Sequence, residues 1–303
     1  MKFFLIKLIS HSLNLLPNRI LLLLGNGLGL LWFYLIPIRK KTIIDNMTLA
    51  FGDEKTPGEI EKLAAKNLRH IGCVLFEALR SIVWSAEDFR KHVPLIGWDS
   101  VDGFIKAKQG GFVISLHLGS WELAPGSGAS HGIPVDVVAK YARKKGADPL
   151  LQWYRQRLGM TMIPETRSTP QILEAISRGR WVGFMMDQFM GPPVGVPVKF
   201  FGHTAGTTGS LAALTEKHNI PCVLATTYRD KKGKVFLVME PMPFPKFSDD
   251  FNTRVWEKTQ YINDILEKKV REYPEQWFWL HRRWKSFNGE SKFAIQTEMI
   301  PQI

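Results

Sequence analysis

The stretch FVISLHLGSWELA, residues 112–124, decides the fold of this chain. Its first three residues, Phe112 to Ile114, form an apolar run that is typical of a strand buried on both faces. A short turn containing Gly119 follows, and the next residues favour the start of a helix. A buried strand, a tight turn and a helix in succession are typical of an α/β fold.

Strands and helices continue to alternate on both sides of this stretch. A helix is expected to begin at Thr56-Pro57-Gly58-Glu59, which has the spacing of a capping box with proline at the first helical position. We expect further strands at 135–139, 181–187, 221–229 and 235–240, and helices at 149–158, 169–177, about 207–218 and 251–272. These elements predict an α/β fold with a mainly parallel central sheet flanked by helices, and with a hairpin at the DKKGK turn.

The N-terminal segment differs from the rest of the chain. Residues 20–38, ILLLLGNGLGLLWFYLIPI, carry no charge and are about long enough to cross ~30 Å of hydrocarbon as a helix. Cations flank the run, and no small-residue cleavage site follows it, which argues against a removed signal peptide. We therefore expect an N-terminal membrane anchor, residues 1–41, with Arg39-Lys40-Lys41 on the cytoplasmic side, and one catalytic domain, residues 42–303.

The glycines within the apolar run leave its mode of insertion open. Gly25, Gly27 and Gly29, together with Asn26 and Pro37, weaken a membrane-spanning helix. A half-inserted or interfacial hairpin tolerates these residues better. A buried core helix is a further alternative, although it fits a wholly apolar stretch less well.

The chain is strongly basic, with a formal net charge of +12. This charge favours an acidic partner: nucleic acid, an anionic membrane surface, a phosphorylated substrate or an acidic protein. No nucleic-acid-binding motif is present, so we expect no nucleic acid. The two cysteines, Cys73 and Cys222, lie in apolar surroundings without metal-like spacing, which predicts buried reduced thiols.

His117 and Glu122 are the candidate catalytic pair. Ligands of open α/β sheets collect at the carboxyl ends of the strands, where His117 is expected to lie. The two side chains can meet only if His117 precedes the helix and the turn at Gly119 folds back. Glu122 would then fix the imidazole tautomer and leave the other ring nitrogen as a base. A core histidine followed by a surface glutamate that caps a helix fits the spacing equally well.

Other chemistries fit the sequence less well. There is no HExxH motif, no GxSxG elbow, no cysteine paired with a histidine and no phosphate-binding glycine loop after a strand. We therefore expect no metal and no cofactor. A base without an enzyme nucleophile predicts direct transfer, in which a deprotonated acceptor hydroxyl attacks an activated acyl donor.

The segment HLGSWE, residues 117–122, looks like the H-x4-[DE] motif of the glycerolipid and lysophospholipid acyltransferase superfamily. Further blocks narrow the resemblance to the bacterial lipid A late acyltransferases, also called lauroyl/myristoyl acyltransferases. They stand in that family's order: NMTLAF (46–51), DPLL (148–151), MDQ (186–188), PVKFFG with AGT (197–202 and 205–207), and PEQWFWLHRRWK (274–285). Asp148 departs from the family's usual asparagine, and residues 140–147 are longer than usual.

The resemblance implies a glycerolipid acyltransferase-like fold and transfer of an acyl chain from an acyl carrier protein thioester to a hydroxyl of a lipid A precursor. It places the protein at the inner membrane of a bacterium, with the catalytic domain facing the cytoplasm. His117 would be the general base and Glu122 its orienting partner, without an acyl-enzyme. The alternative enzyme is an acyl-CoA-dependent acyltransferase for another glycolipid, such as a phosphatidylinositol mannoside, or for a lysophospholipid. An anchored structural protein is the alternative without catalysis.

The resemblance also suggests cationic substrate-binding residues. Arg155, with Arg157 as the second choice, would stabilise the thioester oxyanion or bind a substrate phosphate. A solvated basic helix face would explain the same pair. Arg143 or Lys140 would hold a further cationic place in the longer segment.

Two more residues are expected to bind substrate or to support its site. Asp187 ends an apolar strand and should pair with an arginine, because an unpaired buried carboxylate is costly; capping a helix is the alternative. Thr207, with the amides around Gly206, would bind an anion at the start of a helix, unless it is a plain N-cap.

Aromatic and basic clusters have two interpretations each. Phe200 and Phe201 would line an acyl tunnel or belong to the core. The tail tryptophans suit either a membrane interface, beside Arg282, Arg283 and Lys285, or a buried strand. The tail tryptophans are Trp277, Trp279 and Trp284, and the candidates to meet acyl carrier protein are Lys231, Lys232 and Lys234.

Overall fold

The computed structural model describes residues 2–36, 38–139, 153–154, 156–164 and 167–293. The chain divides into two compact units, each built from three segments. Unit 1 comprises Met1–Leu28, His70–Phe184 and Pro221–Met242, and unit 2 comprises Gly29–Arg69, Met185–Ile220 and Pro243–Ile303. Neither unit begins or ends at residue 41. The predicted boundary between a membrane anchor, residues 1–41, and a catalytic domain, residues 42–303, therefore stays a prediction.

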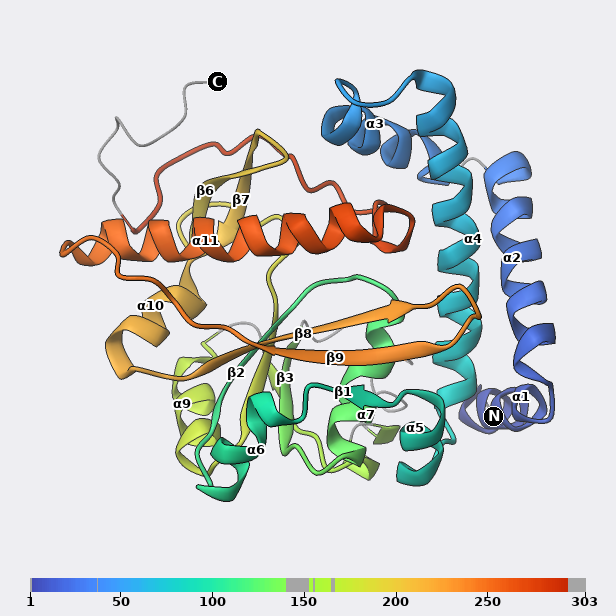
Figure 1. The fold of residues 1–303 in the computed structure, drawn as a ribbon, viewed down its shortest axis with the longest axis horizontal. Coiled ribbons are helices and arrows are strands. Elements are labelled where there is room, and N and C mark those ends of the chain that lie inside the picture. The colour runs from blue at the N-terminus through green and yellow to red at the C-terminus, as the bar shows by residue number, and fades with distance from the viewer. Residues whose placement is uncertain (1, 37, 140–152, 155, 165–166, 294–303) are drawn as a thin grey trace. The chain divides into compact units, whose positions relative to one another are not determined.

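Unit 1 is built around a seven-stranded sheet with the order β1-β9-β8-β2-β5-β3-β4 (Figure 1). The pairs β1–β9, β2–β8, β3–β4 and β3–β5 are parallel, whereas β8 and β9 form an antiparallel hairpin. The predicted α/β fold with a mainly parallel sheet and a late hairpin is confirmed. The strands are β1 (Leu95–Ile96), β2 (Gly111–Ser115), β3 (Val135–Ala139), β4 (Met162–Pro164), β5 (Trp181–Met185), β8 (Cys222–Arg229) and β9 (Val235–Pro241).

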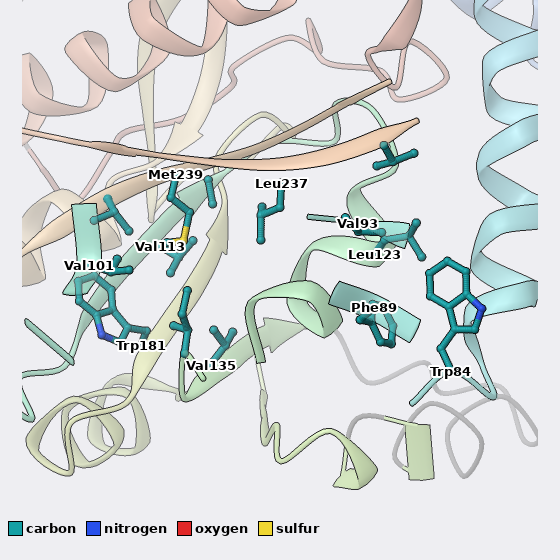
Figure 2. Close-up of a cluster of buried hydrophobic side chains, with 14 residues drawn as sticks. Trp84, Phe89, Val93, Val101, Val113, Leu123, Val135, Trp181, Leu237 and Met239 are labelled. Carbon is teal, nitrogen blue, oxygen red and sulfur yellow. The ribbon is translucent and has the colours of Figure 1, made fainter. Parts of the chain in front are cut away.

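The core of unit 1 explains why the β2 sequence is so apolar. Residues Gly111 to Ile114 are all buried, because β2 lies between β8 and β5 in a sheet covered by helices. Side chains from the sheet and from the helices form one cluster, in which Trp181 of β5, Phe89 and Leu123 are fully or almost fully buried (Figure 2). The helices that contribute side chains to this cluster or pack against it are α5 (Ala86–His92), α6 (Asp99–Lys106) and α7 (Ala124–Ser130), and α9 (Thr169–Ser177) precedes β5.

Unit 2 contains a hairpin where the sequence predicted the start of a helix. Strands β6 (Gly195–Phe200) and β7 (His203–Thr208) pair antiparallel, and α10 (Ser210–His218) begins only afterwards. The turn between the strands is made by Phe201 and Gly202 at φ 52° and 73°. Two successive positive φ angles are typical of the tight turns that join antiparallel strands. The expectation of a helix from residue 207 is therefore wrong by three residues.

The core of unit 2 joins this hairpin to two helices. The side chains of Val196 and Val198 on β6 pack against α10 and against Val255 of α11 (Phe251–Glu272). Helix α3 (Lys40–Phe51) belongs to the same unit. Trp256 of α11 donates its indole N–H to the Pro197 carbonyl oxygen at 2.8 Å, which ties the helix to the strand.

The N-terminal region forms two helices, α1 (Lys2–Asn14) and α2 (Asn18–Leu35). Within the part of the chain that the structure describes, α2 is the one helix that is long and apolar enough to cross a membrane. The predicted anchor helix is therefore present, and it begins two residues earlier than expected. Leu23 and Leu35 on it are 76% and 72% exposed, so much of its apolar surface is uncovered.

The glycines of α2 form a contact face. A Cβ atom at Gly25 would lie 2.6 Å from the Cα atom of Cys73, and one at Gly29 would lie 2.3 Å from the Cα atom of Arg69. Both partners belong to α4 (Pro57–Ser81), whereas Gly27 has no such neighbour within 4 Å. Only glycine permits this close approach of two helix backbones. The helix thus has one face packed on protein and another that is apolar and exposed.

Two smaller predictions are also confirmed. Thr56 and Glu59 form the capping box at the start of α4, because the backbone N–H of Thr56 donates to the Glu59 carboxylate at 2.9 Å and the N–H of Glu59 donates to Thr56 Oγ1 at 3.4 Å. Cys73 and Cys222 are both buried.

Candidate active site

His117 lies two residues beyond the end of β2, in a tight turn. The backbone N–H of Leu118 donates to the carbonyl oxygen of Leu116 at 2.8 Å, which closes a three-residue turn centred on His117. Leu116 and Leu118 are buried, whereas the His117 side chain is half-buried. The turn therefore fixes the histidine by its two neighbours and leaves its ring accessible.

Gly119 continues the turn as the sequence predicted. Its φ angle is 61°, which glycine adopts without strain. A Cβ atom there would lie 2.3 Å from the carbonyl oxygen of Thr227. The positive φ and the close approach to β8 both require glycine at this position.

Glu122 follows in a short 3-10 helix, Trp121–Leu123, with its side chain exposed. Trp121 contacts both members of the predicted pair. Its indole N–H donates to Glu122 Oε1 at 3.2 Å, and its ring meets the His117 ring edge to face, with centroids 5.6 Å apart. His117 and Glu122 thus lie on one short loop, and the side chain of Trp121 contacts both of them. The catalytic roles of His117 and Glu122 stay predictions.

A buried ion pair supports this loop from α4 and β8. The guanidinium of Arg229 donates to both carboxylate oxygens of Glu77, one of them at 2.8 Å. The hydroxyl of Ser120 donates to the same carboxylate. Burial alone would lower the pKa of Arg229, but the Glu77 carboxylate holds this pKa above its ordinary value.

Two further side chains hold the loop backbone. The ring Nε2 of His70 lies 3.0 Å from the carbonyl oxygen of Gly119, so this nitrogen carries the proton and donates it. Burial, followed by the charge of Arg229, lowers the pKa of His70 to about 4, so the ring is neutral at pH 7. Thr227 Oγ1 donates to the carbonyl oxygen of Leu118 at 2.7 Å. We name Ser120, Glu77, Arg229, His70 and Thr227 the loop clamp.

Sequence reasoning missed the loop clamp, although one signal was present. His70 and Glu77 are seven residues apart on α4, a spacing that places both on one helix face, among apolar residues such as Val74. Polar residues repeated at helical spacing on a buried face predict a polar partner elsewhere. The ion-pair partner of Glu77, Arg229 on β8, is 152 residues away, and no local pattern points to it.

The predicted cationic substrate residues are only partly described. Arg143, Lys140 and Arg155 lie outside the described residues. Arg157 is exposed; its guanidinium donates to the carbonyl oxygen of Trp84 and lies 5.0 Å above the ring of Trp153. These two contacts hold the Arg157 side chain within unit 1, and its role in substrate binding stays a prediction.

Asp187 is buried in unit 2, two residues beyond β5, as its position at a strand end predicted. It is 2% exposed, and its Oδ2 accepts a hydrogen bond from the indole N–H of Trp277 at 2.7 Å. The contact with Trp277 satisfies one of its oxygens. An arginine partner for Asp187 stays a prediction.

Thr207 does not stand at the start of a helix, so the predicted N-cap is wrong and an anion site of the expected kind, at a helix start, does not form there; a role of Thr207 in substrate binding stays a prediction. It lies inside β7 and is fully buried, and its hydroxyl belongs to a hydrogen-bond network around Arg283. The Arg283 guanidinium donates to Thr207 Oγ1, to the carbonyl oxygens of Gln188 and Gly206 at 3.1 and 2.5 Å, and to Asn263 Oδ1 at 2.8 Å. These contacts give Thr207 a structural role in unit 2.

Two of the three tail tryptophans are core residues, so the structure favours the buried alternative over a membrane interface at this place. Trp277 and Trp279 are 1% and 0% exposed. Phe200 packs on Trp277 and Phe201 on Trp279, with ring centroids 5.6 and 6.1 Å apart. Trp284 is half-buried beside them. The acyl-tunnel interpretation of Phe200 and Phe201 gives way to its alternative, a packed aromatic core.

Two asparagines fix the backbone of this tail. The side-chain amide of Asn46 on α3 donates to the carbonyl oxygens of Trp279 and His281 at 2.8 and 2.7 Å. The amide of Asn67 on α4 donates to the carbonyl oxygen of Trp277 at 2.7 Å. Buried carbonyl groups need such donors, which gives Asn46 and the tail block a shared structural role.

Comparison with known proteins agrees with the sequence motifs. A family model described as bacterial lipid A biosynthesis acyltransferase matches residues 1–286. The chain is 26% identical to a lipid A biosynthesis lauroyltransferase of Escherichia coli K12, over 89% of this chain and 87% of the relative. It is 27% identical to a lipid A biosynthesis palmitoleoyltransferase of the same organism, over 92% and 90%. A lipid A biosynthesis acyltransferase of Haemophilus influenzae is 26% identical, over 92% and 88%.

Proposed function

Because the chain belongs to the bacterial lipid A biosynthesis acyltransferase family, and is therefore an acyltransferase, we propose that it moves a fatty acyl chain from an acyl carrier protein thioester to a hydroxyl of a lipid A precursor. The relatives named as lipid A biosynthesis acyltransferases support the acceptor class. The observation that carries the proposal is the placement of His117, half-buried in a clamped turn beyond the central strand β2.

The proposed chemistry is one direct transfer. His117 accepts the proton of the acceptor hydroxyl as its oxygen attacks the thioester carbonyl carbon. The carbon–sulfur bond then breaks, and the leaving thiolate takes the proton from the imidazolium. Glu122 orients the ring and stabilises its positive charge, as a carboxylate does for a catalytic histidine. Arg155 and Arg143 are the proposed donors to the oxyanion or to a substrate phosphate.

Membrane attachment is part of the proposal. The exposed leucines of α2 support insertion of one helix face into a bilayer, because its glycine face packs on α4. We place this attachment at the cytoplasmic face of the inner membrane. Substituting serine for Leu23, Leu31 and Leu35 should shift protein from the membrane pellet to the supernatant at moderate salt. An unchanged distribution would argue against α2 as the anchor.

The proposal of acyl carrier protein as the donor rests on charge. Acyl carrier protein is acidic, and the exposed Lys231, Lys232 and Lys234 in the β8–β9 turn suit an acidic partner. Initial rates with the same acyl chain on acyl carrier protein and on coenzyme A should favour the carrier protein. A higher kcat/KM with coenzyme A would favour the other donor.

The test of the mechanism is turnover of His117→Ala, Glu122→Ala and the double variant, with circular dichroism as the check on folding. General-base catalysis is worth ~10²–10⁴-fold, so His117→Ala should lose about that factor. Glu122→Ala should also lose activity, and the double variant should be little worse than His117→Ala, because both residues serve one step. The exposed His218→Ala and Glu87→Ala variants are matched controls. A folded His117→Ala protein with near wild-type turnover would falsify the mechanism.

A further inference from the structure

A cavity of about 210 Å³ lies in unit 1 next to the loop clamp. Its wall contains Glu77 of the clamp and Leu123, which follows Glu122. Cationic and imidazole side chains from α4, α5 and the β8–β9 turn line the rest of it. We name it the cationic pocket after these residues: Arg80, Lys91, His92, Lys232 and Lys234.

Arg80 is a buried cation whose side chain has only neutral partners. It is 6% exposed, and its guanidinium donates to the side-chain oxygens of Asn14 and Asn18 at 3.3 and 3.4 Å. No ion pair among the described residues includes it. Burial lowers the pKa of Arg80, and the charges of Glu77 and Asp88 oppose this shift without an ion pair to Arg80; Glu77 already pairs with Arg229. A bound anion would supply the missing negative charge.

The basic side chains of the pocket lie close enough to affect one another. The His92 ring stacks on Trp84, with centroids 4.9 Å apart and an interplanar angle of 15°. Burial lowers the pKa of His92, and the charges of Arg80 and Lys91 lower it further, against a weaker opposing effect of Asp88. An anion between these groups would reverse the effect, because its charge favours the protonated ring and the neighbouring cations alike.

The two lysines of the β8–β9 turn are held in place by their backbone. Asp230 Oδ1 accepts hydrogen bonds from the N–H groups of Lys232 and Lys234 at 2.9 and 2.8 Å. Between them Gly233 has a φ angle of 85°, and its carbonyl oxygen accepts from the Asn18 amide at 3.4 Å. The turn is thus tied to α2, so that its lysines stay at the pocket.

We propose that the cationic pocket binds a phosphate group borne by a lipid. A phosphate offers several acceptor oxygens and about two negative charges, which Arg80 and the lysines can share. The cavity is smaller than the ~300–1,000 Å³ that encloses a whole small-molecule ligand, so it suits a headgroup. Asn18 and Leu21 of α2 form part of its wall, and the same helix exposes Ile20 and Leu23. The lipid assignment rests on the proposed membrane function, whereas the phosphate assignment rests on the pocket alone.

The test compares two double variants with the same change in charge. Lys91→Gln/Lys234→Gln removes two exposed cations of the pocket, and Lys106→Gln/Lys108→Gln removes two exposed cations of unit 1 that do not line it. Binding of the full-length protein is measured by flotation with phosphatidylcholine vesicles that contain about 10% phosphatidic acid. We expect the pocket variant to bind roughly tenfold more weakly than the control variant. Vesicles of phosphatidylcholine alone should bind all three proteins equally.

Further arms identify the source of the phosphate. Glycerol 3-phosphate at the concentration of the lipid phosphate should not displace the protein from vesicles. If the acceptor supplies the phosphate, the pocket variant should also raise KM for a phosphorylated acceptor, with little change in kcat, and leave KM for its dephosphorylated form unchanged. Normal kinetics with weakened vesicle binding would instead assign the pocket to a neighbouring phospholipid. Both results keep the proposal, and neither depends on His117 being the base.

Three results would overturn it. Equal weakening of vesicle binding by the two double variants would reduce the effect to general electrostatic attraction. Complete displacement by glycerol 3-phosphate would show that a lipid is not required. Weaker binding of acyl carrier protein by the pocket variant, with normal vesicle binding, would assign the pocket to an acidic protein.

Discussion

Arg229 in unit 1 and Arg283 in unit 2 are both buried arginines, but their charges are compensated in opposite ways. Arg229 donates to both oxygens of a carboxylate, Glu77, which raises its pKa. Arg283 donates to carbonyl, hydroxyl and amide oxygens, and burial lowers its pKa to about 10, against the opposing charge of Asp187. Both remain charged at pH 7, one with an anion in contact and one within a cage of neutral oxygens.

Because of this difference, we expect the two regions to lose stability differently when one partner of the arginine is removed. An ion pair depends on each of its two members, because removing one leaves the other charged and buried. A cage of neutral acceptors loses one bond at a time, and the rest of the cage still solvates the charge. The paired arginine supports the loop of the proposed catalytic residues, whereas the caged arginine joins the tail to β7 and α11. The predictions that follow run from the largest expected effect to the smallest.

The largest effect is expected from Glu77→Gln. The amide keeps the shape of the side chain but leaves Arg229 buried without a counter-charge, which should lower the free energy of unfolding by about 3–5 kcal/mol. Turnover should fall as well, because Ser120 of the loop binds the same carboxylate. Chemical denaturation in detergent and initial rates measure the two effects.

The exposed pair Glu174–Arg178 is the matched control. The guanidinium nitrogen of Arg178 lies 2.6 Å from a carboxylate oxygen of Glu174, but both side chains are more than half exposed. Glu174→Gln should cost less than about 1 kcal/mol and leave turnover unchanged. Equal losses of unfolding free energy in Glu77→Gln and Glu174→Gln would contradict the argument that burial makes the Glu77–Arg229 pair more important. Adding Arg229→Met to Glu77→Gln should restore part of the stability, because it removes the unpaired charge.

A pH-dependent effect of intermediate size is expected at His70. Its pKa is about 4 in the folded chain and near 6.5 when unfolded, so the unfolded chain binds the proton more readily. Stability from the neutral ring is complete above pH ~6.5 and is lost as the pH falls toward 4. The difference of about 2.5 units corresponds to a loss on the order of 3 kcal/mol.

His70→Gln isolates this contribution. Glutamine keeps an N–H donor for the Gly119 carbonyl oxygen but does not titrate. The free energy of unfolding should therefore fall less steeply between pH 6.5 and 4 in the variant than in the wild type. Parallel curves would mean that other groups of the clamp, such as the Glu77–Arg229 pair, account for the acid sensitivity.

The two regions also differ in how far the sequence predicted them. The His117 turn was predicted because its signals are local: an apolar run, a glycine and a polar pair within about ten residues. The clamp beneath it was not, because Glu77 and Arg229 are 152 residues apart. The parallel sheet was predicted for the same reason as the turn, since each buried strand carries its own pattern.

Unit 2 was predicted less well because its motifs suit more than one environment. A tail rich in tryptophan and arginine is typical of a membrane interface and of a packed core alike. The choice depends on distant partners, such as Asn46 and Asn67, which bind the backbone of the tail. The β6–β7 hairpin was missed because Phe201, a non-glycine residue, adopts a positive φ at its turn.

The smallest effect is expected from Thr207→Val, and it decides between two roles. Valine keeps the volume of threonine but removes one of the four acceptors of Arg283, so the free energy of unfolding should fall by about 1–2 kcal/mol. Thr204→Val, on the same strand and half-buried, is the control and should stay within about 0.5 kcal/mol of the wild type. Because Thr207 is fully buried in the cage, KM and kcat should remain near their wild-type values. If Thr207→Val raised KM for the acceptor without a loss of stability, the residue would bind substrate after all, and Arg283 would be insensitive to the loss of a single neutral acceptor.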